Sequence, residues 1–166
     1  MKRSVVTLFL LPALLLLVAA ITETPRMHSR SSAEENAKTL IDEGRRIFRF
    51  DTFGDEAFWT DQLHMQQPVS TLSPQTALSL GLKVDAQALS PATIEAIKHG
   101  KVNLGDPAVT LALIKQNAVL GVVGTFNGNT LTKVGFTCAL CHSTVDNSLA
   151  PGIGRRLDGW ACRSVR

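Results

Sequence analysis

The pentapeptide Cys138-Ala139-Leu140-Cys141-His142 has the spacing Cys-x-x-Cys-His, which is typical of the covalent attachment of a c-type haem. Two cysteines three positions apart share one turn of a helix, so each thiol can form a thioether with a vinyl group of the porphyrin. The adjacent His142 can then offer a ring nitrogen to the iron as its proximal ligand. The pattern therefore predicts one covalent haem c held by Cys138 and Cys141, with His142 as a metal ligand.

Three other roles for these cysteines are weaker alternatives. A thioredoxin-like redox pair needs a buried strand before it and a βαβ setting, whereas a polar hairpin is predicted before Cys138. A zinc site needs a second pair of ligands at finger-like spacing, and the remaining candidates, Cys162 and three histidines, are scattered. A disulfide between Cys138 and Cys141 would be strained. We therefore retain haem attachment as the prediction.

The sixth position of the iron has no obvious ligand downstream of the motif. His64 is the first candidate, because it follows an apolar helical face that can lie against the haem edge. The neighbouring Met65 is the second candidate, and since adjacent helical residues point about 100° apart, only one of the two can bind. His99 lies beside Gly100 at a predicted helix end, where a surface role is the better interpretation. A five-coordinate iron remains open.

Helical patterns dominate the chain upstream of the motif. Residues 21–32 are polar and aperiodic, which favours a flexible lead-in, and Ser32 can cap a helix over residues 33–49. Further helices are predicted over residues 55–66, 72–82, 91–99 and 107–116. Three of them begin at a Ser-Pro or Asp-Pro pair, a common helix start.

A β-hairpin is predicted immediately before Cys138. Residues 119–126 and 131–136 are apolar stretches that flank Asn127-Gly128-Asn129, a sequence suited to a tight turn. We therefore expect a mainly α fold with one small hairpin that delivers the chain to the haem motif.

The N-terminus has the pattern of an export signal. Met1-Lys2-Arg3 is a charged start, residues 5–18 are apolar and rich in leucine, and residues 18–20 are small enough for signal peptidase. We expect residues 1–20 to be a signal peptide and the mature protein to be periplasmic, since c-type haem is attached outside the bacterial inner membrane. An uncleaved signal anchor is the alternative, although the run contains Pro12 and a membrane span needs about 20 apolar residues.

Length and charge limit the other functions. The 166 residues suffice for one domain after the signal peptide. The 17 basic residues fall to 15 when Lys2 and Arg3 are removed, against 14 acidic ones. No basic stripe interleaved with aromatic residues is present, so nucleic acid is not an expected partner. Cys162 is left over in an oxidising compartment, either free or paired with another chain.

Three segments together resemble a family of exported bacterial c-type cytochromes that is distantly similar to the di-haem peroxidase-like cytochromes. They are residues 44–59, residues 138–143 and residues 151–160, and the resemblance covers roughly residues 35–160. It implies a cytochrome c-like helical domain over residues 33–166, one haem c, and electron transfer with redox partner proteins. It also implies processing by the c-type haem maturation machinery.

The loop after His142 resembles that of class I cytochromes c, where a proline carbonyl holds the second ring nitrogen of the proximal histidine. This resemblance makes Pro151 a cofactor-binding candidate, with an ordinary Pro-Gly turn as the alternative. Arg155, with Arg156 beside it, is a candidate partner of the haem propionates, and a solvated surface pair is the alternative.

The chain departs from class I cytochromes at its C-terminal end. Those proteins have a methionine ligand tens of residues after the motif, whereas Met1, Met27 and Met65 all precede it here. We expect the chain to be truncated relative to the family it resembles. The predicted function is a mono-haem carrier of single electrons without enzymatic activity. The alternatives are a peroxidase-like or gas-sensing protein with an open iron, or a non-functional fragment.

Overall fold

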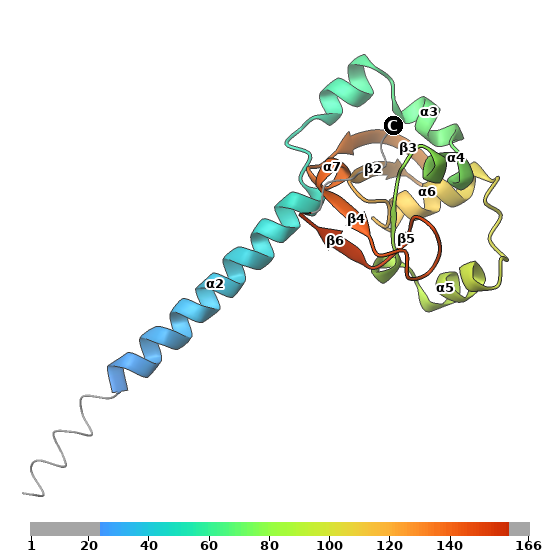
Figure 1. Cartoon of the computed structure of the whole chain (residues 1–166). Coiled ribbons are helices and arrows are strands. Elements are labelled where there is room, and N and C mark those ends of the chain that lie inside the picture. The colour runs from blue at the N-terminus through green and yellow to red at the C-terminus, as the bar shows by residue number, and fades with distance from the viewer. Residues whose placement is uncertain (1–23, 160–166) are drawn as a thin grey trace, which may run out of the picture. The chain divides into compact units, whose positions relative to one another are not determined.

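The computed structural model describes residues 24–159, with side chains from residue 32 onward (Figure 1). The chain divides into two compact units, residues 1–44 and residues 45–166. The expected signal peptide, residues 1–20, and Cys162 lie outside the described residues.

Helix α2 (Thr24–Phe50) supplies all described residues of the first unit. Pro25 lies in its first turn, where proline suits a helix, and the sequence then contains no glycine or proline until Gly44. The helix therefore includes most of the stretch predicted as a flexible lead-in over residues 21–32. The side chains of residues 32–44 are exposed.

The second unit begins with the last turn of α2, which ends at the turn predicted over residues 51–54. A π-helix, η1 (Ala57–Gln62), and a short helix, α3 (Gln66–Thr71), replace the single helix predicted over residues 55–66. The division lies at His64, whose positive φ of +52° is incompatible with a continuous right-handed helix.

Three short helices begin where the sequence predicts them. In each, a Ser or Asp before a proline accepts a hydrogen bond from a main-chain N–H of the first turn, which satisfies a donor that the helix itself leaves free. The capping residues are Ser73, Ser90 and Asp106, and the helices are α4 (Pro74–Ser79), α5 (Pro91–Lys98) and α6 (Pro107–Lys115).

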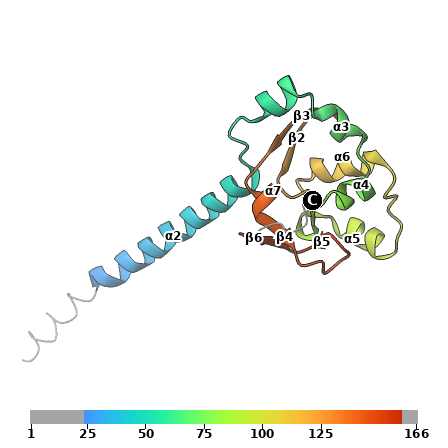
Figure 2. The same ribbon diagram turned by 45° about the horizontal axis from the view of Figure 1, so that its top comes forward.

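The predicted hairpin is confirmed. Strand β2 (Val122–Asn127) pairs antiparallel with β3 (Thr130–Phe136), and the register shifts once, between Thr125 and Phe126. The chain passes from β3 into the four-residue helix α7 (Ala139–His142), which carries the Cys-x-x-Cys-His sequence. Figure 2 shows α7 between this hairpin and the strands that follow it.

The prediction of a mainly α fold is wrong, because the structure is a mixed α/β fold. Two further two-stranded sheets are present in the described part of the chain. Strand β1 (Val84–Asp85), which runs into the 3-10 turn η2 (Ala86–Ala88), pairs parallel with β5 (Ile153–Gly154), and β4 (Ser143–Val145) pairs antiparallel with β6 (Arg156–Asp158). Strands of two or three residues are too short for an alternating hydrophobic pattern, so the sequence does not reveal them.

Two groups of buried apolar residues form the core of the second unit. The first joins β1 to β5 and consists of Val84, Leu89, Ala118 and Ile153. The second lies between α6 and the hairpin and consists of Ile114, Val119, Val122 and Val134. Met65 and Leu140 pack on the second group from α3 and α7, so the helix with the Cys-x-x-Cys-His sequence is attached to the core by its own leucine.

Candidate functional site

Both cysteines of the motif lie on one helical turn, as the sequence predicts. Cys138 precedes α7 in helical conformation, and the main-chain N–H of His142 donates to its carbonyl oxygen at 3.1 Å. Cys138 and Cys141 are exposed free thiols. Two accessible thiols on one turn are the geometry that two thioether bonds to one porphyrin require.

An apolar cavity of about 340 Å³ adjoins α7. Leu140, Cys141 and Ser143 line it on the motif side, and side chains from α3, α4, α5, α6 and the hairpin line the rest. Its volume falls within the range of about 300–1,000 Å³ that small-molecule and cofactor pockets occupy. Because Cys141 both lines the cavity and is exposed, it lies at the cavity mouth.

The donor chemistry suits a covalent haem, because the exposed thiols could hold the edge of an apolar ring at the mouth of an apolar cavity. Cys138 and Cys141 are the residues that would hold it. His142 is exposed beside them, does not line the cavity, and its ring has no hydrogen-bond partner in the described part of the chain. No three His, Cys, Asp or Glu side chains of residues 24–159 gather as ligands for a metal ion. An iron carried by a porphyrin does not need such a cluster, whereas zinc does.

Gly121 allows α7 to lie against the end of β2. It has a positive φ of +71°, and a Cβ at this position would lie 2.1 Å from the main-chain nitrogen of Leu140. Only glycine combines this backbone conformation with so close an approach. The sequence gives no sign of this role for Gly121, because its neighbour Leu140 is close in space rather than in sequence.

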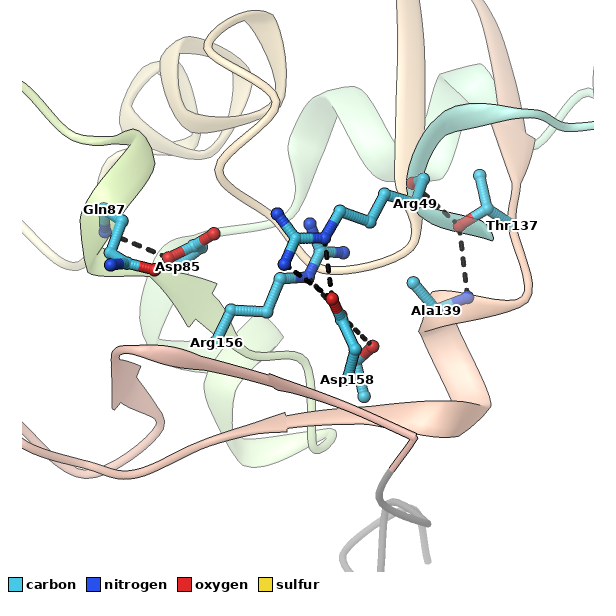
Figure 3. A network of polar contacts seen from close by, with 8 residues as sticks. Arg49, Asp85, Gln87, Thr137, Ala139, Arg156 and Asp158 are labelled. Carbon is cyan, nitrogen blue, oxygen red and sulfur yellow. Dashed lines mark hydrogen bonds and ion pairs between the residues drawn. The ribbon is translucent and has the colours of Figure 1, made fainter. Parts of the chain in front are cut away.

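A network of polar side chains holds both ends of α7 (Figure 3). On one side, the Thr137 hydroxyl donates to the carbonyl oxygen of Arg49 at 3.1 Å and accepts from the N–H of Ala139 at 3.3 Å. On the other side, the Ser143 hydroxyl donates to Asp158 at 2.9 Å. No local pattern in the sequence predicts this network, since its hydrogen bonds to Arg49 and Asp158 connect distant segments.

Asp158 lies between two arginines in this network. It accepts from Nε of Arg49 at 2.7 Å, and Nε of Arg156 lies 3.1 Å from its other oxygen. The Arg156 side chain is only 2% exposed, and burial lowers the pKa of its guanidinium, opposed by the negative charge of Asp158. Its Nε is buried without a well-aligned hydrogen bond to any described residue. Asp158 is therefore the carboxylate that offsets a desolvated positive charge.

The structure does not bring Pro151 and Arg155 to the motif. Pro151 is exposed and forms a Pro-Gly turn with Gly152, which has a φ of +80°. Arg155 is also exposed, and its Nε lies 3.4 Å from Asp146. Neither residue lines the cavity, and neither has a hydrogen bond to His142 in the described part of the chain.

The two candidates for the sixth iron ligand differ in position. His64 is exposed and does not line the cavity, whereas Met65 is half-buried and does. The N–H of Met65 donates to the carbonyl oxygen of Trp59 at 2.8 Å, which turns the chain out of the π-helix and directs it into α3. His99 is a surface residue, 3.7 Å from Glu95, as the sequence predicts.

Comparison with protein-family models, curated proteins and solved structures finds no match to this chain. No helix among residues 24–159 is long and apolar enough to cross a membrane.

Proposed function

We propose that this protein is an exported mono-haem c-type cytochrome that carries single electrons. One observation carries the proposal: two free thiols, on the one-turn helix that ends in His142, lie beside an apolar cavity of cofactor size. The haem, when bound, supplies an iron that accepts and releases one electron. The proposed partners are redox proteins of the same compartment and the machinery that attaches c-type haem.

The residues around the motif would have different roles toward a bound haem. Cys138 and Cys141 hold the haem edge, so the cavity need not retain the cofactor by packing alone. The apolar walls exclude water and lower the local dielectric constant, which is one of the main ways in which a protein sets the potential of a haem. His142, the last residue of the same helical turn, would offer its ring nitrogen to the iron.

We propose that Met65 would supply the second protein ligand to the iron. Among the described residues that line the cavity, three side chains offer a common iron-binding atom or a basic nitrogen: Cys141, Lys83 and Met65. Cys141 is used by the thioether, and Lys83 binds only after losing a proton. A thioether is a soft, neutral ligand, and His/Met ligation raises the haem potential. An iron held by both His142 and Met65 would favour electron transfer over the peroxidase-like or gas-sensing alternative.

The test is expression with a c-type haem maturation system and export to the periplasm. Intact mass should increase by one haem, and the colour should remain with the polypeptide after denaturation and acidic solvent extraction. The variant with both Cys138→Ala and Cys141→Ala should lose the covalent haem, whereas the control Cys162→Ser should keep it. A wild-type protein without covalent haem would overturn the proposal, and a reduced spectrum shifted by carbon monoxide would favour an open iron instead.

A further inference from the structure

We infer that Arg49 and Asp158 are positioning residues that together set the orientation of α7, and through it the two thiols and His142. The inference rests on the proposed function, because it assigns to these residues an effect on a bound haem. It goes beyond that function by identifying what holds the attachment helix in place.

Helix α7 cannot set its own orientation. It has four residues, and a single helical turn is unstable without tertiary contacts because its nucleation cost is not recovered. Its position therefore depends on the groups that hold its two ends. These groups come from α2, β6 and the residues that flank α7.

Arg49 holds both ends of α7 at once. Its main-chain carbonyl oxygen accepts the hydroxyl of Thr137, which in turn caps the N–H of Ala139 at the start of the helix. Its side chain binds Asp158, which accepts the hydroxyl of Ser143 immediately after the helix. Arg49 thus connects the segment that precedes α7 with the segment that follows it.

Asp158 also holds the C-terminal end of α7 through the pairing of β4 with β6. It pairs with Ser143 across the β4–β6 ladder, and the next residue, Gly159, donates its N–H to the carbonyl oxygen of His142 at 2.8 Å. The hydrogen bonds to its carboxylate are charge-assisted and therefore stronger than neutral ones. Loss of the carboxylate would also leave the buried Arg156 without its main counter-charge.

The pair acts on the haem through the orientation of its ligands. Groups that hold a ligating histidine and its backbone commonly change metal affinity or activity by about 10–100-fold when they are removed. A shift of α7 would move both thiols relative to the cavity mouth and change the angle at which His142 meets the iron.

The experiment compares Asp158→Asn and Arg49→Lys with Leu89→Ala, a destabilising core variant that lies outside α7 and whose own side chain does not line the cavity. In the haem-free protein, amide hydrogen exchange at His142 and Gly159 should become about tenfold faster, the equivalent of one charge-assisted hydrogen bond. Exchange at Val134 should change much less. In the haem-loaded protein, the two variants should show a larger high-spin fraction and a shifted reduction potential, which Leu89→Ala should not.

Ser143→Ala provides a milder variant in case the others fold poorly. It removes only the hydroxyl that donates a hydrogen bond to Asp158. The high-spin fraction should therefore rise and the reduction potential should shift, both by less than in the other two variants. If the loaded variants differ from wild type only as Leu89→Ala does, Arg49 and Asp158 serve stability alone and the inference is wrong, while the proposed function stands. If the wild type binds no covalent haem, both fail.

Discussion

The hydroxyl group of Thr60 makes two hydrogen bonds with the main chain of Val134: it accepts from the N–H at 2.9 Å and donates to the carbonyl oxygen at 3.1 Å. Thr60 lies in η1 and Val134 in β3, and both are buried. One side chain thus satisfies the free edge of a strand, as a neighbouring strand would. Asp55 covers the same edge of β3, because its carboxylate accepts a hydrogen bond from the main-chain N–H of Phe136.

Replacement of Thr60 by valine should therefore destabilise the hairpin. The shape is kept, but a buried N–H and a buried carbonyl lose their partner, so we expect the free energy of unfolding to fall by about 2–4 kcal/mol. Urea denaturation followed by circular dichroism measures the change. Thr39→Val is the control, because that hydroxyl is exposed and should contribute less than about 0.5 kcal/mol. Equal effects of the two variants would contradict the prediction.

Replacement of Gly121 by alanine should displace α7. The new methyl group would overlap the main chain of Leu140 and also require a strained positive φ, at a cost of about 2–5 kcal/mol. Haem incorporation should fall as well. Gly128→Ala is the matched control, since Gly128 also has a positive φ but nothing within 4 Å, so its cost should be about 1 kcal/mol. If Gly128→Ala costs as much, the close approach of α7 is not the cause.

Met65→Leu should convert the haem-loaded protein from low spin to high spin. The exchange keeps volume, so the stability of the fold should change by less than about 1.5 kcal/mol. His64→Gln should leave the spectrum unchanged, because His64 does not line the cavity. Absorption spectra of both oxidation states give the result. A high-spin His64→Gln protein and a low-spin Met65→Leu protein would reverse the assignment.

Thr110→Val should be neutral or should stabilise the protein by up to about 1 kcal/mol, because a buried hydroxyl without a partner contributes only a desolvation cost. The hydroxyl of Thr110 has no hydrogen-bond partner among the described residues, and the residue is 3% exposed. Thr137→Val is the contrast, since its hydroxyl makes two hydrogen bonds and its loss should be destabilising. Thermal unfolding of the two variants distinguishes them, and a clear loss of stability in Thr110→Val would contradict the prediction.

The loop between β4 and β5 should loosen in acid. Hydrogen bonds from Ser148, and after them the N–H and guanidinium of Arg155, lower the pKa of Asp146 below its ordinary value of 3.8. A lowered pKa in the folded state means that the carboxylate stabilises the loop above its ordinary pKa, and that this stabilisation is lost as the pH falls through the lowered value. The protection factors of the Ser148 and Arg155 amides, which correct for the pH dependence of intrinsic exchange, should fall in that range. In Asp146→Asn these protection factors should be low at every pH, and a wild-type loop that is no better protected than the variant at neutral pH would contradict the prediction.

Local chemistry made part of the fold predictable. The caps at Ser73, Ser90 and Asp106, and the turn between β2 and β3, involve residues a few positions apart, so sequence alone reveals them. For the same reason both cysteines of the motif could be assigned to one helical turn. The break at His64 was not visible, because the helical spacing continues through it.

By itself, the sequence determined the three helix starts at Ser-Pro or Asp-Pro pairs, the hairpin and the placement of both motif cysteines on one helical turn, since each depends on neighbouring residues. Only the tertiary structure decided which side chains surround that turn. The Arg49–Asp158 pair joins residues 109 positions apart, and Val84 of β1 pairs with Ile153 of β5 across 69 positions. The cavity likewise combines side chains from five helices and the hairpin, and Met65 lines it whereas His64 does not. Contacts of this kind arise from packing the whole chain, and no local pattern records them.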